Sequence, residues 1–106
     1  MQSVLAVGEL PDGGIEASAV FHEKYLTQAQ AALADDSVTA LAITMPAAPS
    51  SHDDWRTALA RDLARAHSPK RVNVVGGPQG EAMDAALAYL GDAQGVTGQY
   101  CPLHEA

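Results

Sequence analysis

His52 and Arg56 are the side chains whose types and spacing best suit a binding or catalytic site. They are four residues apart, so on a helix they would share one face. Beside the backbone N–H groups of a helix N-terminus, this pair could hold an anion. The simpler alternative is an exposed first turn in which Asp53 and Arg56 form an (i, i+3) ion pair. We favour that alternative on the sequence.

A second candidate is the stretch "RVNVVGGPQG", residues 71–80, which contains Gly76, Gly77 and Gly80. Glycines between a strand and a helix can cradle a phosphate. A dinucleotide site, however, needs G-x-G-x-x-G after the first strand and an acidic residue about twenty positions later. The spacing within "GGPQG" differs, and this segment follows the third expected strand. We therefore predict that these glycines serve a sharp turn.

The remaining polar residues do not form a motif for metal binding or catalysis. His22 lies next to Glu23 rather than at a helix-borne ligand spacing, and His67 and His104 fall in linking or terminal segments. Cys101 has no base near it in the sequence, so we expect it to be a packed small residue. Neighbouring carboxylates at helix ends are predicted to be solvated caps: Asp35 with Asp36, and Asp53 with Asp54.

Composition limits the possible functions. A chain of 106 residues predicts one domain, residues 1–106. The net charge of −7 argues against a nucleic-acid partner, which would need clustered Lys and Arg. No run of residues is long and apolar enough to span a membrane, and "MQSVLAVGEL" lacks the features of a signal peptide. With one cysteine, which cannot form an internal disulfide, we expect a cytoplasmic protein.

The elements that must position these residues alternate along the chain. Continuous apolar runs predict strands at 3–8, 38–45, 71–76 and about 97–103, and helical periodicity predicts helices at 17–34, from an N-cap at Ser51 to about 66, and at 81–90. Strands that are apolar throughout and alternate with helices indicate a parallel sheet covered on both faces. The predicted fold is therefore α/β, with a three-layer, mostly parallel four-stranded sheet and three main helices, like a truncated Rossmann fold.

The helix expected at 17–34 has apolar residues on more than one face. Its main stripe is formed by Phe21, Tyr25, Ala29, Ala32 and Leu33, whereas Val20 and Leu26 lie off that stripe. A helix of this kind usually packs against two surfaces. We expect one to be the sheet and the other to belong to another chain.

Two long stretches resemble the C-terminal half of the short-chain dehydrogenase/reductase family. They are "DDWRTALARDLARAHSPKRVNVVGGP", residues 53–78, and "EAMDAALAYLGDAQGVTGQYCPL", residues 81–103. The "RVNVV" and "VTGQ" segments match in sequence and separation. Looser matches place "VLAVGE" at the family's "LVNNAG" strand, "VFHEKYLTQAQAAL" at its long dimer helix and "VTALAIT" at its serine-bearing strand. The resemblance implies the second half of that fold.

The departures from the family concern its chemistry. The first strands, with the glycine-rich turn and the acidic residue for the cofactor, have no counterpart in the sequence. Aligned with "YSASKAAL", "HDDWRTAL" places His52 at the family's tyrosine and Arg56 at its lysine, and neither keeps the required chemistry. The family's serine has no assignable position. The resemblance therefore predicts no cofactor and no hydride transfer by the family mechanism.

What the resemblance retains is subunit association. The helices at 17–34 and 51–66 correspond to the pair that packs about a two-fold axis in the dehydrogenases, and the last helix and strand correspond to a second subunit contact. The strand at 3–8 would also be an unprotected apolar edge. We therefore expect a homodimer or a hetero-oligomer with a related full-length dehydrogenase.

A rival hypothesis is a small-molecule-binding protein or oxidoreductase-related enzyme. It would use the crevice at the carboxyl ends of the strands, where open α/β sheets place their sites. The expected lining is Glu9, Thr44, Met45, His52, Arg56, Gly76 and Gly77.

Overall fold

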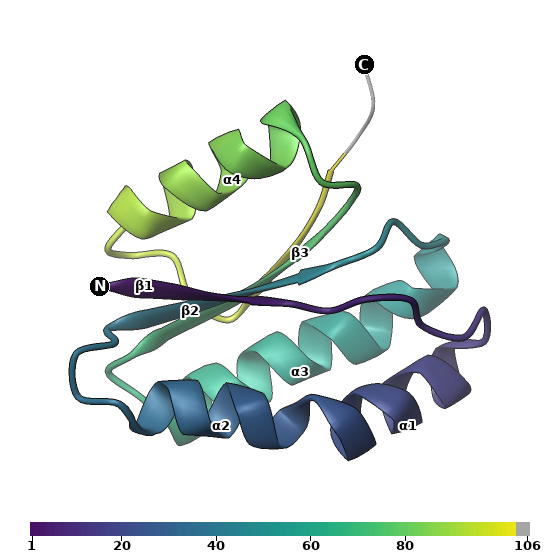
Figure 1. Cartoon of the computed structure of the whole chain (residues 1–106), viewed down its shortest axis with the longest axis horizontal. Helices are drawn as coiled ribbons and strands as arrows, with labels where there is room; N and C mark the ends of the chain where they lie inside the picture. Colours follow the sequence, from purple (N-terminus) through teal and green to yellow (C-terminus); the bar gives the residue numbers. More distant parts are fainter. Residues whose placement is uncertain (104–106) are drawn as a thin grey trace.

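In a computed structural model, which describes residues 1–103, four parallel strands form one sheet in the order β1-β2-β3-β4. The strands are β1 (Gln2–Ala6), β2 (Ala40–Met45), β3 (Arg71–Gly76) and β4 (Gln99–Pro102), and the helices are α1 (Gly14–Lys24), α2 (Leu26–Ala34), α3 (Asp53–Ala66) and α4 (Glu81–Asp92). Helices α1, α2 and α3 cover one face and α4 covers the other (Figure 1). This arrangement confirms the predicted α/β fold class, with four helices in place of three.

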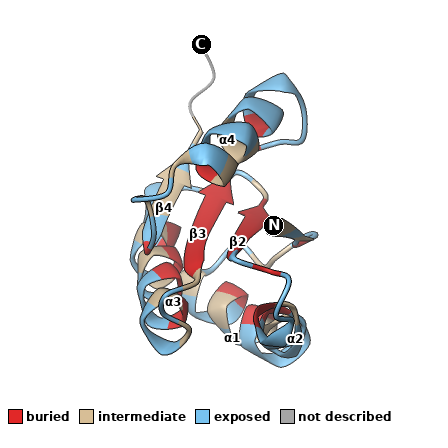
Figure 2. Ribbon diagram, turned by 90° about the vertical axis from the view of Figure 1, so that its left-hand side faces the viewer, coloured by how far each residue is buried: buried red, intermediate tan, exposed pale blue. Residues whose placement is uncertain are grey.

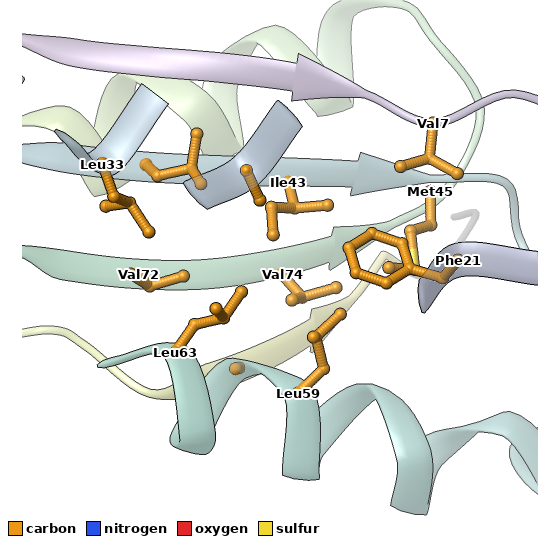
Figure 3. Packing of buried hydrophobic residues seen from close by; sticks show 12 residues of the cluster. Val7, Phe21, Leu33, Ile43, Met45, Leu59, Leu63, Val72 and Val74 are labelled. Carbon is orange, nitrogen blue, oxygen red and sulfur yellow. The ribbon is translucent and has the colours of Figure 1, made fainter. Parts of the chain in front are cut away.

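The two central strands carry most of the core, and every residue of β2 and β3 is buried (Figure 2). Side chains alternate between the faces of a strand. Ile43 and Met45 therefore meet Phe21 and the helices of the larger layer (Figure 3), whereas Thr44 points toward the α4 face. The larger cluster consists of Val7, Phe21, Ala29, Leu33, Leu41, Ile43, Met45, Leu59, Ala60, Leu63, Val72 and Val74.

Helix α4 covers the opposite face with a smaller core. Val75, Met83 and Leu90 form a separate buried cluster. The buried Arg71 at the start of β3 reaches the end of α4, where its Nη1 donates to the Leu90 carbonyl at 2.6 Å and to the Ala93 carbonyl at 2.9 Å. A cation at this position satisfies carbonyls that the helix itself leaves without donors.

The single helix predicted at 17–34 is wrong, because the structure divides it at Tyr25 into α1 and α2. The ring of Tyr25 stacks on Phe21, and its hydroxyl accepts a hydrogen bond from the Gly8 N–H at 3.3 Å. These contacts tie the junction to the segment that leaves β1. The sequence has no glycine or proline there to mark the break.

The start of α3 also differs from the prediction. Ser51 is not an N-cap, because a 3₁₀ turn, Ser50–His52, runs directly into α3, and within the described part of the chain no side chain caps the helix. The turn follows Pro49, whose backbone is extended. Asp53 and Asp54 occupy the first turn of α3 as predicted.

The outer side of β1 is an open sheet edge. The Thr39 N–H donates to the Met1 carbonyl, and the Val7 N–H donates to the Thr44 carbonyl. Backbone groups of successive strand residues point to opposite sides of the strand. The odd-numbered Met1 and Val7 face β2, so the backbone groups of the even-numbered Val4 point away from β2. The Val4 side chain is 48% exposed. Among residues 1–103, no helix is long and apolar enough to cross a membrane.

Candidate functional site

Arg56 lies in the first half of α3 and is buried, with 1% of its surface exposed. Its Nη1 donates to the Pro46 carbonyl at 2.9 Å and to the Tyr100 hydroxyl at 3.2 Å. The guanidinium carbon lies 5.6 Å from the ring centre of Trp55 and 5.7 Å from that of Tyr100. The predicted exposed ion pair with Asp53 is therefore wrong, because α3 directs Arg56 inward to the ends of the strands.

His52 is also buried, with 2% exposed, and it links three parts of the chain. One ring nitrogen, Nε2, lies 2.7 Å from the Asp12 carbonyl, and the other, Nδ1, lies 3.1 Å from Trp55 Nε1. The indole N–H can only donate. Nδ1 therefore accepts from Trp55 and carries no proton, and Nε2 donates to Asp12. Both nitrogens are used within the fold.

Tyr100 was missed by the sequence reasoning, although it completes the surroundings of Arg56. It pairs in register with Val74, whose side chain lies in the larger core, so Tyr100 faces α3. Gly76 makes room for this contact. A Cβ at Gly76 would lie 2.5 Å from Tyr100 Oη and 2.8 Å from Arg56 Nη1, so this glycine is required by close approach. Period-two alternation in the last strand was the available signal.

A cavity of about 70 Å³ adjoins this arrangement. It is lined by Leu10, Pro11, Asp12, Pro46, Ala47, Ala48, Pro49, His52 and Arg56. Of the crevice residues that the sequence suggested, His52 and Arg56 line this cavity. Gly76 lies next to the Arg56 guanidinium. We call it the Arg56 cavity.

The other suggested crevice residues do not meet there. Thr44 points to the α4 face, and its hydroxyl is buried and has no hydrogen-bond partner among residues 1–103. Met45 belongs to the larger core. Glu9 is exposed and is not part of the cavity lining. A Cβ at Gly77 would lie 2.9 Å from Leu103 Cδ1, so Gly77 packs against Leu103.

The glycine-rich turn shows the local geometry that the sequence reasoning expected of a turn. Gly80 has a φ of 149°, which other residues rarely adopt, and it directly precedes α4. The first turn of α4 carries Glu81 and Asp84. These carboxylates oppose the binding of a phosphate at this helix N-terminus.

The other candidates also have local partners. His22 Nδ1 lies 2.7 Å from the Ser18 carbonyl. Asp35 accepts hydrogen bonds from the Ser37 N–H at 2.9 Å and hydroxyl at 2.8 Å, and these bonds lower its pKa. Burial raises the pKa of the half-buried Cys101 thiol. In the part of the chain that the structure describes, no group of three metal-ligating side chains forms, and His104 lies outside that part.

A larger hollow lies on the outer side of the helical layer. We define the outer groove as two adjoining hollows of about 450 and 330 Å³ between α1/α2 and α3. Its principal lining is Ile15, Ser18, His22 and Leu26 on one side, and Asp54, Trp55, Ala58, Asp62 and Ala66 on the other. Ile15 is 86% exposed.

The fold and the sites together define an α/β protein of the Rossmann-like class. A model of the family described as "SDR-like: Short chain dehydrogenase-like protein" matches residues 5–103. The chain therefore belongs to this family of short chain dehydrogenase-like proteins, which confirms the resemblance. A search of curated proteins and a search of solved structures each found no match.

Proposed function

We propose that this chain is a non-catalytic, dehydrogenase-like association domain that pairs through its outer groove with a second copy of itself. The observation that carries the proposal is the outer groove. It exposes apolar side chains on the helices that correspond, by resemblance, to the family's two-fold helix pair. The same face would suit the matching helices of a full-length relative, giving a hetero-oligomer.

The groove has the composition of a contact surface. Ile15 and the half-buried Leu26 and Trp55 supply large apolar groups. Ala58 and Ala66 are exposed on α3, and their small side chains allow another helix to approach closely. Contiguous exposed apolar surface with a polar rim often marks a protein–protein interface. Burial of Leu26 in such an interface would also account for its position off the main stripe.

The arrangement of polar groups does not favour the family's chemistry. That chemistry needs a tyrosine hydroxyl and a lysine free to meet a carbonyl and a cofactor. At the aligned positions, both nitrogens of His52 are hydrogen-bonded within the fold, and Arg56 Nη1 is hydrogen-bonded to Pro46 and Tyr100. An association function does not require these groups to be free to meet a substrate.

The open edge of β1 provides a second reason to expect a partner. An edge with unpaired backbone groups and an exposed Val4 is prone to pair with another strand. Residues 7–13 lead from β1 to α1, and as far as the structure describes the chain, no backbone hydrogen bond of this segment reaches the outer side of β1. The edge is therefore available for an additional contact in the same assembly.

The proposal is tested by size-exclusion chromatography with light scattering over a wide range of protein concentration. We expect a dimer whose mass is unchanged by NADPH. Ala58→Glu places a carboxylate in the groove and should shift the mass toward the monomer. Ala82→Glu, at an exposed site on α4, is the matched control and should leave the dimer intact.

Two results would contradict the proposal. One is a monomer at every concentration with no co-purifying relative. The other is a dimer that Ala82→Glu disrupts and Ala58→Glu does not, which would move the interface from the outer groove to α4. Tight NADPH binding by the isolated chain would contradict the non-catalytic assignment.

A further inference from the structure

We propose that the Arg56 cavity binds a small monovalent anion of the carboxylate class. Arg56 carries a positive charge, as every guanidinium does at physiological pH. Within residues 1–103, no carboxylate lies within ion-pair distance of this buried group, and the ion pair that does form there joins the exposed Arg65 and Asp62. A buried charge is costly unless an opposite charge or hydrogen bonds compensate it.

The compensation around Arg56 is incomplete. Nη1 is satisfied by Pro46 and Tyr100, and the two aromatic rings add cation–π attraction. Nε is buried and has no hydrogen-bond partner among the described residues. Because Nε and Nη2 form one edge of the planar guanidinium, their N–H groups match the two oxygens of a carboxylate. The donor geometry therefore selects the class of ligand.

The adjoining cavity sets the size and charge of the anion. Its volume of about 70 Å³ suits formate or an ion of similar size rather than a nucleotide or a sugar phosphate. Asp12, which is exposed, is part of the same lining. Asp12 and the chain's net charge of −7 disfavour a second negative charge on the ligand, so a singly charged anion should bind better than sulfate or phosphate.

The anion site goes beyond the proposed association function and can be tested separately. The Arg56 cavity and the outer groove have no lining residue in common. Trp55 lines the outer groove and its ring centre lies 5.6 Å from the Arg56 guanidinium carbon, so the two sites are neighbours. They have separate readouts, because light scattering reports the dimer, whereas the formate and chloride experiments report the anion site.

The first experiment measures the thermal midpoint of wild type, Arg56→Met and Arg65→Met in sodium formate and in sodium sulfate. We expect a saturable rise in formate for wild type and for Arg65→Met, whose exposed arginine lies on the same helix. Arg56→Met should show only the non-saturating salt response, and sulfate should give no saturable rise in any variant. An equal formate response in all three proteins, or saturation by sulfate alone, would overturn the proposal.

The second experiment needs no variant to fold. The ³⁵Cl linewidth of chloride is measured in the presence of native wild type, and formate is then added. We expect the protein to broaden the line and formate to reverse the broadening by competition. Broadening no greater than that caused by the urea-unfolded chain, or broadening that formate does not reverse, would overturn the proposal.

Discussion

Replacing Gly76 with Ala should destabilise the protein through contacts around Arg56. The new Cβ would lie 2.5 Å from Tyr100 Oη and 2.8 Å from Arg56 Nη1, well short of the 3.4 Å at which ordinary contacts begin. Both neighbours are held by hydrogen bonds, including the one between them. They can move aside only by weakening those bonds.

The magnitude follows from two opposing terms. Overpacking a filled site costs about 1–3 kcal/mol. Alanine lowers the entropy of the unfolded chain and returns about 0.4–1 kcal/mol, since the φ of Gly76 is not positive. With the middle of each range, the free energy of unfolding should fall by about 1.3 kcal/mol. With a urea m-value of about 2 kcal/mol/M, the midpoint should fall by roughly 0.5–1 M.

Urea unfolding followed by circular dichroism gives the comparison. Gly95→Ala is the control, because a Cβ there meets no atom of residues 1–103 within 4 Å, and it should be neutral or slightly stabilising. In a Tyr100→Phe background the penalty of Gly76→Ala should shrink, because the nearest atom is gone. An unchanged midpoint for Gly76→Ala, or an equal penalty in both backgrounds, would refute the reasoning.

Three further predictions concern helix ends and the thiol. Arg71→Met leaves the Leu90 carbonyl without its donor, and we expect a loss of at least about 2 kcal/mol in urea unfolding. Ser37 donates to Asp35 and lowers its pKa below the ordinary value of 3.8. Asp35→Ala should therefore be less stable than wild type above pH 3.8. The difference in the free energy of unfolding should diminish as pH falls through the folded-state pKa of Asp35. Burial raises the pKa of Cys101, so an aromatic disulfide reagent should label the native chain more slowly than the urea-unfolded chain.

Each of these predictions has its own control. Arg65→Met removes an exposed arginine and should change stability little. Asp36→Ala removes the neighbouring exposed carboxylate, so a pH profile equal to that of Asp35→Ala would contradict the role of Ser37. For Cys101, equal labelling rates in native and unfolded protein would show that burial does not control the thiol.

The strands could be predicted because their signals are local. Continuous apolar runs at 38–45 and 71–76 are found in β2 and β3, where every residue is buried. The divided helix at Tyr25 could not be predicted in this way. At the break, the Tyr25 hydroxyl accepts a hydrogen bond from Gly8, 17 residues earlier in the sequence, and helix propensity carries no information about such a contact.

Only some of the predicted crevice residues line the Arg56 cavity. Thr44 and Met45 are adjacent in a strand, so they cannot both line the same side of a sheet. The structure places them on opposite faces. The burial of Arg56 was less accessible, because it depends on Tyr100, which lies far away in sequence and reaches α3 only through the pairing of β4 with β3.

The contacts that α3 makes on its inner side also affect the outer groove, through which we propose that the chain associates. His52 ties the start of α3 to Asp12, and Arg56 ties it to Pro46, so two loops hold the helix without any ligand. Trp55 lies between these residues, donates to His52 and lines the outer groove. A side chain already fixed in the free protein loses little conformational entropy on binding. The polar groups at the family's catalytic positions would thus favour assembly by holding Trp55 in place, and a His52→Ala variant that still folds should dimerise more weakly for that reason.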